Sequence, residues 1–125
     1  VSLYLNTANI DLEHAAAMIE QTVEDPHPRV NADIARWMRA RDMVLRGVNV
    51  TERLRRRREP LFVVTANRDG IVPSAASRAA LSAWGGPVEA LEVGDATGWY
   101  AHADLFVGRE APARVFAPIA RFLAR

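Results

Sequence analysis

Two residues in the second half of the chain, Asp69 and His102, have the types and the order of an acid–histidine pair. A histidine that acts as a general base needs an acceptor at its other ring nitrogen, because that acceptor selects the tautomer and stabilises the imidazolium. Asp69 lies just after an apolar run, Leu61–Ala66, and His102 lies in the loop after a second run, Val88–Val93. We therefore expect both side chains at one sheet edge, where the carboxyl ends of parallel strands carry ligand-handling residues.

The elements that must hold this pair alternate between strand and helix. Leu61–Ala66 is apolar and β-branched, which is typical of a strand buried on both faces of a parallel sheet. A helix over Ser74–Trp84 leads to the strand Val88–Val93, and a strand–helix–strand crossover in one sheet yields a parallel pair. A last helix is expected over Glu110–Leu123, with a kink or a split at Pro118. The predicted fold class is α/β.

The first half of the chain is predicted to be mainly helical. Apolar positions at helical spacing favour a helix over residues 11–23 and a second helix over residues 31–46, for which Asn31 is a suitable cap. Gly47 is expected directly after that helix, and residues 48–54 are expected to form a loop or a short turn.

The motif D-x-I-V-P at residues 69–73, followed by a strand and a loop with a histidine, resembles the C-terminal third of α/β-hydrolase-fold enzymes. In that family the nucleophile, the acid and the histidine follow one another in this order along the chain. The resemblance implies a partial α/β-hydrolase fold in which Asp69 is the acid and His102 the histidine of a catalytic triad.

Two residues beside His102 bear on this assignment. Asp104 is a rival acid, but it stands two positions from His102 and would have to fold back to reach the ring, so Asp69 is favoured. Many members of the family have glycine directly before the histidine, where this chain has Ala101.

The nucleophile of such a triad is not in the printed sequence, which contains neither G-x-S-x-G nor G-x-C-x-G. We expect the nucleophile and its oxyanion-hole amide to lie upstream of Val1, on the missing N-terminal part of the same fold. The chain alone is then expected to be inactive. Whether the nucleophile is serine or cysteine stays open.

The segment before the acid strand resembles the corresponding region of polyhydroxyalkanoate-synthase-like members of the fold. The residues that carry this resemblance are Trp37, Arg41, Asp42, Leu45, Gly47 and Asn49. The resemblance implies a helical cap or connector over residues 1–58 and a C-terminal α/β unit over residues 59–125 that carries the acid and the histidine. Trp37 and Met38 either line an acyl pocket or pack in the core.

The function expected from these features is that of an enzyme acting on a small-molecule acyl ester or thioester, with no cofactor implied. Within enzymes, the alternative is a polyhydroxyalkanoate-synthase-like acyltransferase. In a different class, the alternative is a non-catalytic α/β domain used for binding or assembly.

The overall composition excludes several other classes. A formal net charge of +1 argues against nucleic acid as the partner, and the run Arg55–Arg58 is flanked by Glu52 and Glu59 and lacks an aromatic residue. There is no cysteine, and the three histidines share no ligand spacing, so neither a disulfide nor a metal site is expected. No apolar stretch is long enough for a membrane span, and we expect a cytoplasmic protein.

Overall fold

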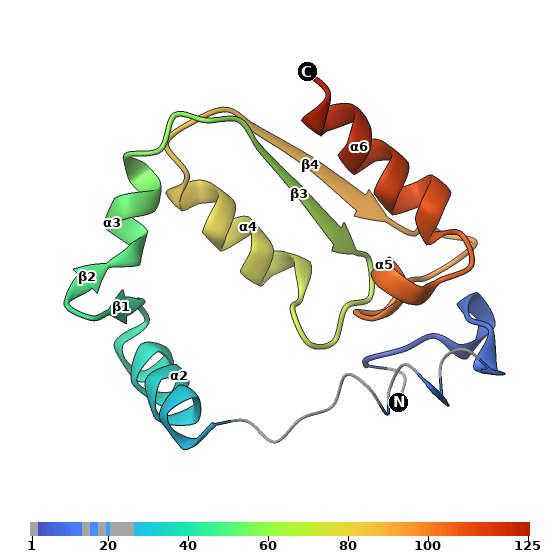
Figure 1. Cartoon of the computed structure of the whole chain (residues 1–125), viewed down its shortest axis with the longest axis horizontal. Coiled ribbons are helices and arrows are strands. Elements are labelled where there is room, and N and C mark those ends of the chain that lie inside the picture. The colour runs from blue at the N-terminus through green and yellow to red at the C-terminus, as the bar shows by residue number, and fades with distance from the viewer. Residues whose placement is uncertain (1–2, 14–15, 18–19, 21–26) are drawn as a thin grey trace.

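A parallel pair of strands, β3 (Leu61–Ala66) and β4 (Val88–Val93), forms the centre of the second half of the molecule. The computed structural model describes residues 3–13, 16–17, 20 and 27–125 (Figure 1). The strands pair in step, from Leu61 opposite Val88 to Ala66 opposite Val93, so both end at the same level. The predicted parallel pairing is therefore confirmed, and the fold is a mixed α/β arrangement.

Helices cover both faces of this pair. The crossover helix α4 (Ser74–Ala83) lies along one face, and α6 (Ala117–Leu123) lies along the other (Figure 1). Side chains alternate between the faces of a strand, and accordingly Val63 lines a groove with α4, whereas the ring of Phe62 stacks on Phe122 of α6 at 5.2 Å between centroids.

The best-buried residues lie at the carboxyl ends of the strands and beneath the loop that carries His102. One cluster consists of Ala66, Val93, Tyr100, Leu105, Ala111 and Val115. A second cluster, Leu5, Ile10 and Ala103, joins the N-terminal segment to that loop. Burial is thus greatest at the sheet edge that holds Asp69 and His102, rather than at the middle of the sheet.

The first half of the described chain differs from the prediction. Helix α2 spans Pro28–Ala40, not residues 31–46, because His27 supplies the N-cap: its Nδ1 accepts a hydrogen bond from the amide of Arg29. Proline is favoured in the first turn of a helix, which is consistent with this earlier start. The helix ends at Arg41, which has a left-handed backbone with φ of 51°.

A hairpin and a short helix replace the expected end of that helix. Strands β1 (Val44–Leu45) and β2 (Val48–Asn49) pair antiparallel, and α3 spans Val50–Arg55. The hairpin turn holds Arg46 and Gly47 at positive φ, so Gly47 serves a two-residue turn instead of a helix end. The prediction of a loop over residues 48–54 is also wrong.

The remaining segments are short helices and connections. Residues 7–9 form a 3₁₀ turn, η1 (Thr7–Asn9), and α5 spans Asp104–Val107. The predicted break at Pro118 is a change of hydrogen-bond register, from a π-helical turn, η2 (Pro112–Phe116), to α6. The helix expected over residues 11–23 lies largely outside the described residues, although residues 12–13, 16–17 and 20 are helical.

Candidate functional site

The structure brings the side chains of Asp69 and His102 into direct contact. The distance between Oδ2 of Asp69 and Nδ1 of His102 is 2.8 Å. Asp69 stands in the turn after β3, and His102 stands in the longer connection between β4 and α5. Because the two strands are parallel and end in step, both connections leave the same sheet edge, which is the geometric reason for the contact.

The carboxylate of Asp69 is buried and fully engaged. Its Oδ1 accepts hydrogen bonds from the amides of Ile71 at 2.8 Å and Val72 at 2.7 Å, which leaves Oδ2 for the imidazole. Burial by itself raises the pKa of Asp69, but the amide of Val72, the ring of His102 and the amide of Ile71 together lower it below its ordinary value of 3.8. Asp69 is therefore held as a carboxylate that orients His102.

The imidazole of His102 is held from three sides. The ring centroid lies 5.9 Å from that of Tyr4 and 6.4 Å from that of Phe106, which approaches nearly edge-on. A carboxylate can only accept, so Nδ1 carries the proton toward Asp69 and a neutral ring presents Nε2 as a base. In the part of the chain that the structure describes, Nε2 has no hydrogen-bond partner, and 31% of the side-chain surface is exposed. Asp69, Tyr4 and Phe106 thus hold the ring without enclosing it.

Asn67 joins the two connections that carry the pair. Its backbone amide donates to the carbonyl of Val93, and its side-chain Oδ1 accepts from the backbone amide of Tyr100 at 2.9 Å. Its Nδ2 reaches the carbonyl of Asp95 at 3.3 Å. The turn after β3 that carries Asp69 is called the acid turn below. Its first residue, Asn67, is thus bonded to both ends of the segment that leads from β4 to the histidine.

Asp104, the rival acid, does not bond to His102. Its side chain is completely buried, and it accepts hydrogen bonds from the amides of Asn6 and Ala101 and from Nδ2 of Asn9. The sequence favours Asp69 over Asp104 as the acid but does not predict these contacts. The sequence contains no signal for these contacts apart from two asparagines, Asn6 and Asn9, in a short and otherwise largely apolar segment.

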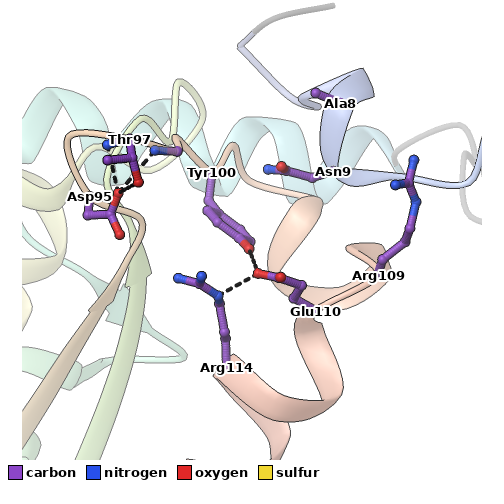
Figure 2. Close-up of a pocket in the computed structure, with 9 residues that line it drawn as sticks. Ala8, Asn9, Asp95, Thr97, Tyr100, Arg109, Glu110 and Arg114 are labelled. Carbon is purple, nitrogen blue, oxygen red and sulfur yellow. Dashed lines mark hydrogen bonds and ion pairs between the residues drawn. The ribbon is translucent and has the colours of Figure 1, made fainter.

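The segment between β4 and α5 that carries His102, residues 94–103, is called the histidine connection below. A polar pocket of about 210 Å³ lies beside it (Figure 2). Tyr100 donates its hydroxyl to Glu110 at 2.9 Å, and Arg114 pairs with the same carboxylate (Figure 2). Burial and this hydrogen bond raise the pKa of Tyr100, while the Tyr100 hydroxyl and Arg114 lower the pKa of Glu110. Through these contacts the histidine connection is joined to the start of η2. His102 does not take part in them.

Trp37 and Met38 do not join this site. Both lie on α2, which is well separated from α5 and the strand ends in Figure 1. Nε1 of Trp37 donates to the carbonyl of Val44 at 2.8 Å and so links α2 to the hairpin, whereas Met38 is 74% exposed. The structure therefore provides a structural contact for Trp37, and a role for either residue in substrate binding stays a prediction.

The described ranges hold neither a candidate metal-binding cluster nor a helix suited to span a membrane. Among those residues, no cluster of three or more histidine or acidic side chains is arranged to hold a metal ion. None of the helices described is long and apolar enough to cross a membrane.

Comparisons with known proteins provide no further assignment. No protein-family model, no curated protein and no solved structure matches this chain. The resemblance to α/β-hydrolase-fold enzymes, and the catalytic roles of Asp69 and His102, therefore stay predictions that rest on residue order and geometry.

Proposed function

We propose that the chain supplies the acid and the histidine of an α/β-hydrolase-fold enzyme that acts on ester or thioester acyl groups. The single observation that carries the proposal is the 2.8 Å contact between Asp69 and Nδ1 of His102 at the carboxyl edge of a parallel strand pair. The exposure of the ring supports it further, because a general base must have access to the proton that it removes.

In this mechanism His102 moves a proton twice. Nε2 removes the proton from the nucleophile as the nucleophile attacks the acyl carbon, and the resulting imidazolium is stabilised by Asp69. The imidazolium then protonates the departing alcohol or thiol, which leaves an acyl-enzyme and a neutral ring. In the second half, Nε2 removes a proton from water or from an acceptor alcohol as its oxygen attacks the acyl-enzyme. The imidazolium then returns this proton to the released nucleophile, which restores the neutral ring.

The nucleophile is assigned to a polypeptide segment outside these 125 residues. The printed sequence has no nucleophile elbow, and the hydroxyls of Ser74 and Ser82 donate to Glu92 and to the carbonyl of Ala79, respectively. The proposal therefore includes the expectation that the 125-residue chain alone does not hydrolyse esters. With a serine nucleophile we favour hydrolysis, and with a cysteine nucleophile we favour polyhydroxyalkanoate-synthase-like acyl transfer to an alcohol.

The test uses the polypeptide that the complete gene encodes and the 125-residue chain in parallel. Hydrolysis of p-nitrophenyl butyrate and of a butyryl thioester is measured for both, with an added alcohol to detect acyl transfer. In the complete polypeptide, His102→Ala is expected to lower kcat by about 10⁴-fold or more. The matched control is His27→Ala, because His27 caps α2 and has no contact with Asp69.

Each outcome has a distinct reading. Loss of turnover with His102→Ala and normal turnover with His27→Ala supports the proposal. Equal turnover in both variants removes His102 from the mechanism. A gene product without any upstream elbow, or one without acyl chemistry, favours the non-catalytic alternative of a binding or assembly domain.

A further inference from the structure

The first eight described residues pack against both connections of the candidate site. This N-terminal segment, residues 3–10, places the carbonyl of Leu3 3.0 Å from the amide of Gly70, directly after the acid. The carbonyl of Tyr4 accepts from the amide of Ala103, directly after the histidine, at 2.8 Å. One short segment thus bonds to the residue that follows each member of the pair.

The close approach of this segment depends on Gly70. A Cβ at Gly70 would lie 2.8 Å from the Cα of Leu3, which is closer than real Cβ contacts. Glycine at the position after Asp69 is therefore what allows the backbone of Leu3 to lie against the acid turn.

Asp104 holds this segment to the histidine connection. Its Oδ1 accepts from the amide of Asn6 at 2.9 Å, and its Oδ2 accepts from Nδ2 of Asn9 at 2.9 Å and from the amide of Ala101 at 3.0 Å. Both asparagines also donate to the carbonyl of Trp99, at 2.8 and 2.9 Å. A buried carboxylate must be satisfied by hydrogen bonds, so its three donors are held where they are.

These contacts also place an aromatic ring against the histidine. Tyr4, two positions before Asn6, lies 5.9 Å from the His102 ring, and Ala101, the residue before His102, donates to Asp104. Figure 2 shows Asn9 next to Tyr100, where the N-terminal segment meets the histidine connection. The Asp104 carboxylate and this ring contact therefore add to the bonds through the carbonyls of Trp99 and Tyr4 that join the segment to the connection.

We propose that Asp104 is a positioning residue for His102: it locks the N-terminal segment and the Ala101 amide to a common carboxylate, so that Tyr4 and Asp69 together define the orientation of the imidazole. This inference rests on the proposed function, because it assigns a role to Asp104 through His102. Among the described residues, the side chain of Asp104 makes no hydrogen bond to Asp69 or to the imidazole nitrogens.

The test follows the imidazole of His102 in the 125-residue chain by long-range ¹H–¹⁵N correlation, which reports which ring nitrogen carries the proton. The wild-type chain is expected to show a single tautomer with the proton on Nδ1. In Asp104→Asn, one oxygen becomes an amide donor that faces N–H groups, so at least one of the three hydrogen bonds is lost. We expect the His102 ring signal to change to an average of both tautomers. We also expect the hydrogen-exchange rates of the Ala101, Ala103 and Gly70 backbone amides to rise about tenfold or more.

Asp95→Asn is the matched control. Asp95 also accepts three hydrogen bonds, from the amides of Thr97 and Gly98 and from the Thr97 hydroxyl, and it precedes the histidine in the same connection. It has no hydrogen bond to the N-terminal segment in the part of the chain that the structure describes, so the His102 signal is expected to be unchanged. If Asp104→Asn fails to fold, Asn9→Ala serves instead, because it removes one donor to Asp104 and is expected to shift the signal in the same direction.

The outcomes separate this inference from the proposed function. Faster amide exchange with an unchanged His102 tautomer would overturn it, since Asp104 would then only anchor the segment. An equal change in Asp95→Asn would also overturn it. A wild-type ring without a proton on Nδ1 would instead refute the acid–histidine pair, and with it the proposed function.

Discussion

The side chain of Asn67 occupies the space next to Gly94 where any larger residue would place its Cβ. A Cβ built on Gly94 lies 2.3 Å from Oδ1 of Asn67, and the backbone of Gly94 has φ of +107°. The residue that follows β4 is thus fitted to the residue that follows β3. This contact holds the acid turn and the histidine connection at a set separation.

Replacing Gly94 by alanine is expected to destabilise the chain through two effects. The left-handed backbone alone costs an L-residue about 1–2 kcal/mol, and the clash with Asn67 adds to that cost. Gly47→Ala is the matched control, because Gly47 also has a positive φ, of +78°, but has nothing within 4 Å of its Cβ position. Thermal unfolding of both variants should show a larger loss of stability for Gly94→Ala. Equal losses would mean that Asn67 moves aside freely.

Replacing Asp69 by asparagine is expected to reverse the tautomer of His102. The side-chain oxygen of the new amide would still accept from the amides of Ile71 and Val72, so its NH₂ group would face Nδ1. Nδ1 must then accept, and the ring proton moves to Nε2. Long-range ¹H–¹⁵N correlation measures this directly. In the complete polypeptide, the same variant is expected to lower kcat by about 10⁴-fold, because Nε2 is no longer a base. An unchanged tautomer would show that Asp69 does not select it.

The Asp69 contacts also predict how stability depends on pH. The pKa of Asp69 is lower in the folded chain than its ordinary value of 3.8, so the carboxylate stabilises the fold above that value. This contribution is lost as the pH falls below 3.8 and through the lowered pKa. Near neutral pH, the free energy of unfolding of the wild-type chain should exceed that of Asp69→Asn by about 1–3 kcal/mol. This difference in stability should shrink in acid. Urea unfolding of both proteins at several pH values measures this difference. Plots of unfolding free energy against pH that stay parallel into acid would contradict the prediction.

The free edge of β3 is expected to promote self-association. Among the described residues β3 pairs only with β4, and apolar grooves of about 370 and 380 Å³ line its two faces. An unpaired apolar strand edge is a template for another strand. Sedimentation velocity should therefore show association that increases with concentration, and Val63→Glu should reduce it.

Ala90→Glu is the control for that variant, because Ala90 is the partner of Val63 in the strand ladder but is exposed on β4. It is expected to leave self-association unchanged. A wild-type chain that stays monomeric over the whole concentration range, with a sharp cooperative melt, would contradict the prediction of an exposed edge.

The sequence by itself determined the parallel strand pair and the meeting of Asp69 with His102. Both depend on local signals, namely apolar runs of strand length, a connecting helix and polar residues just after each strand, and on the handedness of the crossover, which is nearly invariant. These signals lie within a few residues of the elements that they specify. The α/β class could therefore be predicted without knowing any long-range contact.

Only the tertiary structure decided what surrounds that pair. Asp104 is bonded to Asn6, 98 positions earlier, and the ring of Tyr4 lies against His102. A hydrogen bond between residues so far apart in the chain leaves no periodicity in the sequence, so the sequence presents Asp104 only as a rival acid. The hairpin at Gly47 was missed for a related reason, since a glycine after a helical pattern serves a helix end and a two-residue turn equally well. Which of the two it forms depends on the pairing of Val44 with Asn49, and that pairing exists only in the folded chain.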